Sequence, residues 1–227
     1  MNYIFDGLKE GVHLLVTFNQ DVYQVIFLSI AVSFMSSLIS SVIGIPLGLL
    51  ILSKDFTLKK MTVRLINTMM AMPPVVIGLV TAILLARKGP FGVFELMFTP
   101  SAMVIAQTIL ITPIVMGIII NNTKAKAQHT IDTCESLGAN RFETFKMLVL
   151  ELRKVIMGAY VAGFGRAVSE VGAIMLVGGN IRGATRTMTT FIAMNNSMGN
   201  YETSIAMGLI LILLAFVANT ILYKLIE

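Results

Sequence analysis

The sequence predicts an all-α protein, a polytopic membrane bundle of about five transmembrane helices. Four stretches of more than 20 residues lack any Asp, Glu, Lys, Arg or His side chain: 22–53, 65–86, 96–123 and 203–223. A fifth stretch, 155–181, carries only Arg166 and Glu170. About 20 apolar helical residues are enough to cross the bilayer core. These runs are continuously apolar rather than alternating, which favours helices over a β-barrel.

Composition and charge support this class. The chain is 56% hydrophobic and only 13% charged, which leaves too little polar surface for a soluble globule. The formal net charge of +5 could suggest a nucleic-acid partner, but 16 of the 17 Lys and Arg residues lie outside the spans, Arg166 being the exception. Eleven of them fall in 53–64, 122–154 and the C-terminal tail: Lys54, Lys59, Lys60, Arg64, Lys124, Lys126, Arg141, Lys146, Arg153, Lys154 and Lys224. The opposite side holds five: Lys9, Arg87, Lys88, Arg182 and Arg186. The positive-inside rule then predicts an N-out, C-in multi-pass protein of the plasma membrane, without a nucleic-acid partner.

The pattern of residues 1–21 predicts a short amphipathic helix on the outer face of the membrane. Apolar positions recur at helical spacing among polar ones: Leu8, Val12, Leu15 and Val16. Such a helix lies in the headgroup region rather than crossing the membrane. We expect residues 1–227 to form a single transmembrane domain that contains this helix.

The first two spans each carry a helix-disturbing sequence. Span 22–53 is long enough to tilt, or to bend at 44–48, which contains two glycines and a proline. A loop over 53–64 leads to span 65–86, whose centre is Met72-Pro73-Pro74. Each proline removes an amide hydrogen and crowds the carbonyl four residues earlier. These residues either shape a translocation path or only kink the helix.

The remaining elements follow in order. The third span, 101–121, contains Thr112-Pro113, which has the same two interpretations. The segment 122–154 predicts two short cytoplasmic helices joined by a turn at Gly138-Ala139-Asn140. Span 155–181 follows, and then a polar external segment, 178–202, whose apolar part is expected to dip into the bundle. The last span ends near Lys224.

Arg166 and Glu170 are charges at membrane depth. They lie four residues apart and therefore share one face of a helix. Such residues usually point into the bundle or into a water-filled cavity, where they pair. They are either a gate lining an anion path or an ion pair that fixes packing. The second interpretation is favoured, because an unneutralised Glu170 would repel an anion.

The cytoplasmic segment resembles a signature of the permease subunits of ABC-type importers. That signature reads Glu-Ala-Ala, three residues, Gly, nine residues, then Ile-x-Leu-Pro. Here the corresponding residues are Asp132-Thr133-Cys134, Gly138 and Leu148-Val149-Leu150-Glu151. The spacing and the glycine match, whereas Asp132, Cys134 and Glu151 depart from the pattern.

Further stretches are similar to those of molybdate, sulfate and tungstate permeases. They are Ala71–Leu79, Arg87–Gly92, Gly165–Ala173 and Gly178–Ile181. The stretch Thr185–Thr190 most resembles the tungstate branch. The resemblance covers nearly all of the chain after the first span.

The resemblance implies a type I ABC importer permease that moves a tetrahedral oxyanion by alternating access. Tungstate is the expected substrate, with molybdate and sulfate as alternatives. The implied partners are a second copy of this chain, a dimer of ABC ATPase subunits and an extracytoplasmic solute-binding protein, besides the lipid. The chain has no Gly-x-x-x-x-Gly-Lys-Ser/Thr loop, so ATP is expected on the partner ATPase and no cofactor on this chain. We therefore expect no enzymatic activity from the permease itself.

Two other function classes are a passive anion channel and an intramembrane enzyme. A passive anion channel is compatible with the same membrane helices. An intramembrane enzyme finds little support, because the sequence shows no convergent acid/base set. The single cysteine, Cys134, excludes an internal disulfide, and the distant His13 and His129 predict no metal site.

The resemblance also assigns candidate site residues. ATPase coupling is expected from Asp132, Thr133, Cys134, Leu137, Gly138, Ala139, Phe142, Phe145 and Leu148. Among these, Leu137, Phe142 and Phe145 could anchor a helix docked in a groove of the ATPase. The alternative is a linker helix that rests on lipid headgroups. The candidate translocation path or gate consists of Met72, Pro73, Pro74, Thr112, Arg166 and Glu170.

Overall fold

The computed structural model describes residues 3–17 and 19–224, and within these ranges it contains helices and no strand. The helices are α1 (Tyr3–Val16), α2 (Gln20–Ser53), α3 (Lys59–Met70), α4 (Pro74–Leu85), the 3₁₀ turn η1 (Gly92–Phe94), α5 (Pro100–Ser136), α6 (Arg141–Glu151), α7 (Arg153–Val168), α8 (Gly172–Gly178), α9 (Met188–Ser197) and α10 (Tyr201–Lys224). The predicted all-α class is confirmed.

Three helices in the described part of the chain are long and apolar enough to cross a membrane, namely α2, α5 and α10. Two bent pairs raise the number to five if each pair counts as one span: α3 with α4, at 97°, and α7 with α8, at 60°. The prediction of about five spans agrees with this upper number. The second span is broken where the sequence predicts a disturbance, at Met72-Pro73-Pro74, whereas the break in the fourth span was not expected. Because α4 begins at Pro74, its missing amide costs no helical hydrogen bond.

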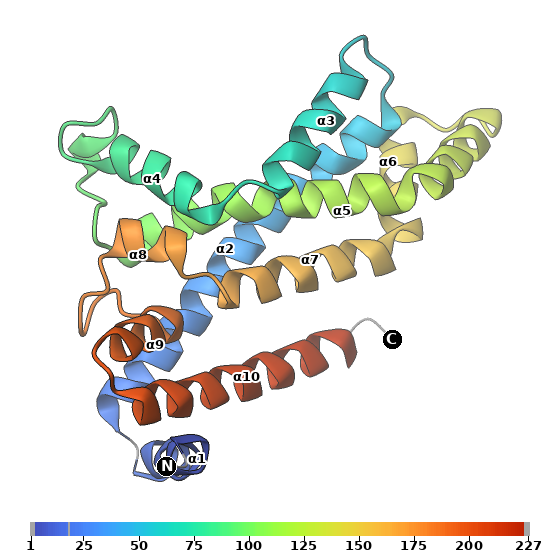
Figure 1. Cartoon of the computed structure of the whole chain (residues 1–227). Coiled ribbons are helices and arrows are strands. Elements are labelled where there is room, and N and C mark those ends of the chain that lie inside the picture. The colour runs from blue at the N-terminus through green and yellow to red at the C-terminus, as the bar shows by residue number, and fades with distance from the viewer. Residues whose placement is uncertain (1–2, 18, 225–227) are drawn as a thin grey trace.

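The direction of the helices separates the molecule into two ends. Figure 1 shows that α2, α5 and α10 start at the left and run the same way, whereas α3–α4 and α7–α8 run back. One end therefore gathers α1, α8, α9 and the end of α4. The other gathers the loop between α2 and α3, the turn between α5 and α6, and the end of α10. This is the division of the loops that the sequence predicts.

The core forms where α2 packs along α5. A Cβ added at Gly44 would lie 3.2 Å from the carbonyl oxygen of Thr112, so the two backbones approach closely. Small residues permit such contacts between membrane helices. Buried serines recur along α2: Ser29, Ser33, Ser36, Ser37, Ser40 and Ser41. Among them, Ser36 and Ser40 donate to Gln107 and to the Thr108 carbonyl of α5. Helix α5 thus becomes the central element against which α2, α3, α7 and α8 pack.

The N-terminal helix α1 packs across α10. A Cβ at Gly7 would lie 2.7 Å from Ile205, and Gly11 lies against Ala206. Figure 1 shows α1 nearly end-on beside the start of α10. The predicted amphipathic helix is present, although it ends at Val16, and its apolar residues Leu8, Val12 and Val16 are exposed. Leu15 is the fourth residue of the predicted apolar face, and its side chain lies outside the described part of the structure.

The segment 122–154 corrects one prediction and confirms another. The first of the two expected short helices is not separate, because α5 continues without a break to Ser136. The turn is where the sequence places it: Gly138 has φ +74°, a left-handed conformation that suits glycine. Asn140 then caps α6, with Glu143 completing a capping box. No glycine or proline interrupts 122–137, which explains the long helix.

Candidate functional site

The two helix breaks lie side by side. A Cβ added at Gly172, where α8 begins, would lie 2.7 Å from Cγ2 of Val75 in the first turn of α4. A Cβ at Gly78 would lie 2.6 Å from the Cα of Ala173. The first turns of α4 and α8 are therefore in direct backbone contact. The contact joins the residues that directly follow the two groups of candidate path residues: Val75 comes after Met72-Pro73-Pro74, and Gly172 comes two residues after Glu170.

The break between α7 and α8 is organised by Glu170. Its side chain is 3% exposed, and its Oε2 lies 3.2 Å from Nη2 of Arg166. The backbone amide of Ala173 donates to Oε1 at 3.1 Å, so the same carboxylate caps the start of α8. The Glu170 carbonyl accepts from the Thr189 hydroxyl at 2.7 Å, which ties the break to α9. The ion pair that the spacing predicts is present. Arg166, with a side chain 37% exposed, is the member of the pair that reaches the surface.

The break between α3 and α4 is more open. Pro73 is exposed, and Met72 and Pro74 are half-buried. Just before them, the Met70 side chain occupies the space over Gly117 of α5 that a Cβ would need. The break therefore lies near Gly117, which is close to the middle of α5.

Thr112 lies apart from these two groups. Its hydroxyl donates to the Thr108 carbonyl at 2.7 Å, one turn earlier in α5. Its own carbonyl faces Gly44 of α2. The threonine thus contributes to the packing of α2 on α5 rather than to the paired breaks.

Gln107 is a buried polar residue of this region that the sequence did not single out. It is fully buried and links three helices. Its Oε1 accepts from Ser36 of α2 at 2.7 Å, and its Nε2 donates to the Ala167 carbonyl of α7 at 2.9 Å. In the sequence, the signal for this residue would have been a single glutamine within an apolar run, together with the many serines of 22–53. Gln107 fixes the end of α7 immediately before the break.

The nine predicted coupling residues divide into an exposed tip and a buried base. Leu137 is 81% exposed and Phe142 77% exposed, on either side of the exposed Gly138. Cys134 and Leu148 are buried, and Phe145 packs against the same core cluster as Leu148. The others are the exposed Asp132 and Thr133 and the half-buried Ala139. The turn is therefore an apolar knob on a well-packed support.

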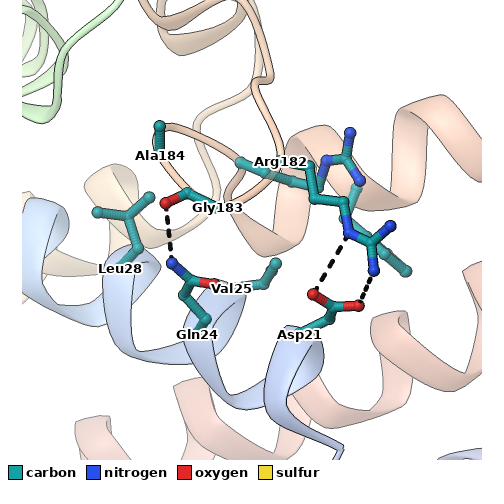
Figure 2. Close-up of a pocket in the computed structure, with 9 residues that line it drawn as sticks. Asp21, Gln24, Val25, Leu28, Arg182, Gly183 and Ala184 are labelled. Carbon is teal, nitrogen blue, oxygen red and sulfur yellow. Dashed lines mark hydrogen bonds and ion pairs between the residues drawn. The ribbon is translucent and has the colours of Figure 1, made fainter.

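The opposite end of the molecule has a pocket of about 150 Å³ between the start of α2 and the loop 179–187. Figure 2 shows Arg182 reaching toward Asp21, with its Nε donating to the carboxylate at 3.3 Å. Beside it, the Gln24 side chain donates to the Gly183 carbonyl at 2.9 Å. Arg186 is held by Asn180 at 3.2 Å. The bonds of Arg182 and Gln24 fasten the loop to α2, and the bond between Arg186 and Asn180 lies within the loop.

Glycines also allow close contacts between helices in this region. Besides Gly78 and Gly172, Gly163 lies against Ile111 of α5. At Gly158 and Gly165, in contrast, nothing lies within 4 Å of an added Cβ.

Comparison with known proteins decides the family. Residues 40–227 match the family described as "Binding-protein-dependent transport system inner membrane component". The chain belongs to this family. The permease is 40% identical, over 227 residues and the whole of both chains, to the tungstate uptake system permease protein TupB of Peptoclostridium acidaminophilum. It is 34% identical over 225 residues to TupB of Campylobacter jejuni, covering 99% of this chain and 94% of that one.

A more distant relative of the permease is named for another oxyanion. The sulfate transport system permease protein CysW of Escherichia coli is 24% identical over 216 residues, which cover 90% of this chain and 74% of CysW. The predicted ABC importer permease of the tungstate, molybdate and sulfate group, an inner-membrane protein, is confirmed.

Proposed function

We propose that the permease imports tungstate as the membrane subunit of an ATP-driven importer. The observation that carries this proposal is the full-length similarity to tungstate uptake permeases, 40% and 34% identical. Importing a dianion against a negative-inside potential costs about 4–5 kcal/mol per 100 mV. Uptake at low external concentration therefore needs an energy source. ATP bound to a separate pair of ATPase subunits supplies it, and this chain itself holds no cofactor.

The exposed tip of the α5–α6 turn is the proposed contact with the ATPase. Leu137 and Phe142 offer a small apolar knob, and Gly138 between them allows close backbone approach. Helices that dock in a partner's groove use such anchors. Below the knob, Cys134 and Leu148 are buried, so the tip moves together with the core. Because α5 is continuous from Pro100 to Ser136, a displacement at the tip reaches the level of the helix breaks.

The paired breaks are the proposed translocation region. Met72, Pro73 and Arg166 retain exposed surface in the single chain, as expected of residues that face a path or a second copy of the permease. Glu170 is buried and paired, so we assign it a positioning role: it holds Arg166 and caps α8. A homodimer would place two such break regions around one path. An extracytoplasmic binding protein would deliver the anion to the end that carries α9.

Reconstitution tests this function. The permease, its ATPase and its binding protein are placed in liposomes, and accumulation of tungstate is measured with ATP and with a non-hydrolysable analogue. We expect accumulation only with ATP and with all three components. A passive anion channel would instead conduct with the permease alone, whatever the nucleotide. Calorimetry of the binding protein with tungstate, molybdate and sulfate then separates the three substrates, and tightest binding of molybdate or sulfate would reject tungstate.

A further inference from the structure

A second pocket lies at the end of the molecule that holds the cytoplasmic loops. It has a volume of about 560 Å³ and lies between the end of α2, the helix α3 and the second half of α5. Four basic side chains line it, Lys59, Lys60, Arg64 and Lys124, together with one acidic side chain, Asp55. Four positive charges less one negative charge leave an excess of three. A pocket with this excess calls for an anion.

The basic residues are brought together by the pairing of α3 with α5. Lys60, Arg64 and Asn67 follow one another at intervals of four and three, so they share one side of α3. The Asn121 side chain of α5 donates to that of Asn67 at 3.0 Å. Because α3 and α5 run in opposite directions, the residues that precede Asn67 lie beside those that follow Asn121. Arg64 and Lys124 therefore both lie beyond the asparagine pair, where they line the same pocket.

The acidic residue, Asp55, already forms an ion pair within the chain. Lys59 lies 3.0 Å from Asp55 Oδ1 and also donates to the Leu52 carbonyl at 3.2 Å. Within the part of the chain that the structure describes, no ion pair is formed by Lys60, Arg64 or Lys124. Three like charges around one pocket repel one another unless a bound anion neutralises them.

The walls of the pocket identify the kind of anion. Beside the basic residues lie four apolar ones, Ile51, Leu52, Val63 and Ile120. A free, hydrated oxyanion gains nothing from such walls, whereas an amphiphile uses both surfaces. The position fits as well, because α3 turns 97° from α4 at the end of the bundle where the positive-inside rule places the cytoplasmic leaflet. Basic pockets on that side of membrane proteins bind acidic lipid headgroups.

We propose that Lys60, Arg64 and Lys124 bind the phosphate group of an anionic phospholipid of the inner leaflet. The lipid's acyl chains lie along the apolar wall formed by α2 and α3. Lipid held there fixes the position of α3 relative to α5. It thereby also fixes the position of the α3–α4 break, which begins at residue 71. This inference does not depend on which oxyanion the permease transports.

Native mass spectrometry tests the site with phosphatidylglycerol as the probe, in micelles that also contain phosphatidylcholine. The variant Lys60→Gln/Arg64→Gln/Lys124→Gln is compared with Lys9→Gln/Arg87→Gln/Lys88→Gln, which removes three charges at the opposite end. We expect roughly 100-fold weaker retention of phosphatidylglycerol in the first variant, the loss that three basic residues imply. The control variant should retain the lipid as the wild type does. If the triple variant does not fold, Arg64→Gln alone should weaken retention about fivefold.

Two results would overturn the proposal. One is equal retention of phosphatidylglycerol by the first variant and the wild type. The other comes from equilibrium dialysis of the lipid-free protein against tungstate and inorganic phosphate. Binding of either free anion that is lost in the variant, with lipid retention unchanged, would make this a site for a soluble oxyanion instead.

Discussion

Gly78 of α4 lies so close to Ala173 of α8 that a Cβ at position 78 would come within 2.6 Å of the Ala173 Cα. The neighbour is backbone, which cannot rotate away. This contact holds the second halves of the two broken spans together, and Gly172 against Val75 repeats it nearby. The relative position of the two breaks thus depends on the absence of side chains at two glycines.

Replacing Gly78 with Ala should therefore destabilise the permease by about 1–3 kcal/mol, the usual cost of forcing extra atoms into a packed core. Gly208→Ala is the matched control, because nothing lies within 4 Å of a Cβ there and alanine is the better helix former. Thermal unfolding in detergent measures both variants. Equal midpoints for Gly78→Ala and Gly208→Ala would show that α4 and α8 are not in backbone contact.

Arg166→Ala should be more damaging than its partial exposure suggests, because it leaves the carboxylate of Glu170 buried without a counter-ion. We expect a loss of about 2–3 kcal/mol, less than for a fully buried pair since Arg166 is 37% exposed. Adding Glu170→Gln should recover part of this stability, because the neutral amide still accepts from the Ala173 amide. Folded yield and unfolding midpoint report the recovery, and its absence would argue against the ion pair.

Glu170→Ala removes both the partner of Arg166 and the cap of α8. We expect less assembled complex and less uptake in this variant. Uptake is measured per assembled complex, so that a loss of transport is separated from a loss of folding. Wild-type uptake together with normal assembly would discard both the gating and the positioning role.

Phe142→Ala tests whether the exposed tip contacts the ATPase. The side chain is 77% exposed, so its loss should leave the unfolding midpoint unchanged. Affinity for the ATPase should fall about 30-fold if this residue is a binding hot spot. Leu148→Ala is the contrasting variant: the side chain is fully buried, and its truncation should cost about 2–5 kcal/mol of stability. Unchanged ATPase affinity in Phe142→Ala, measured by co-purification and titration, would place the contact elsewhere.

The end of α6 is fastened to α5 by an ion pair that gives a pH dependence. Lys126 Nζ lies 2.8 Å from Glu151 Oε1. The hydrogen bond from Lys126, aided by its charge, holds the pKa of Glu151 below its ordinary value. The stabilisation is therefore present above the unfolded-state pKa and is lost as the pH falls through the folded-state pKa.

The stability difference between wild type and Glu151→Gln should accordingly shrink below about pH 4, near the carboxyl's unperturbed pKa. The difference should be small and salt-sensitive at neutral pH, because both side chains are exposed. Thermal unfolding of both proteins between pH 3 and 7 measures it. A difference that grows on acidification would contradict the assigned direction.

The sequence predicted those features that follow from continuous apolar runs or from single strong signals. Helices α2 and α10 follow from runs without charge, and the turn at Gly138 follows from a glycine that reaches a left-handed φ. The Pro73-Pro74 pair located the first break but not its 97° angle, because that angle is set by packing of α3 on α5 and α4 on α8.

The second break had no comparable signal. The residues around Glu170 include no proline, and the new helix that begins at Gly172 is instead held by the Glu170 side chain, which accepts from the Ala173 amide. Likewise, the lone Gln107 becomes informative only once Ser36 and the Ala167 carbonyl are brought beside it from two other helices. Coupling of the ATPase through the turn, and the path along the breaks, remain predictions.

The central claim is that the α5–α6 turn faces the cytoplasm while α9 faces outward. Leu137→Cys and Met198→Cys, each made with Cys134→Ala, place one exposed thiol at either end, since Leu137 is 81% and Met198 65% exposed. An impermeant maleimide is applied to intact cells that express the permease without its ATPase. The account predicts labelling of residue 198 in intact cells, and of residue 137 only after permeabilisation. Labelling of residue 137 in intact cells would invert the topology and contradict the account.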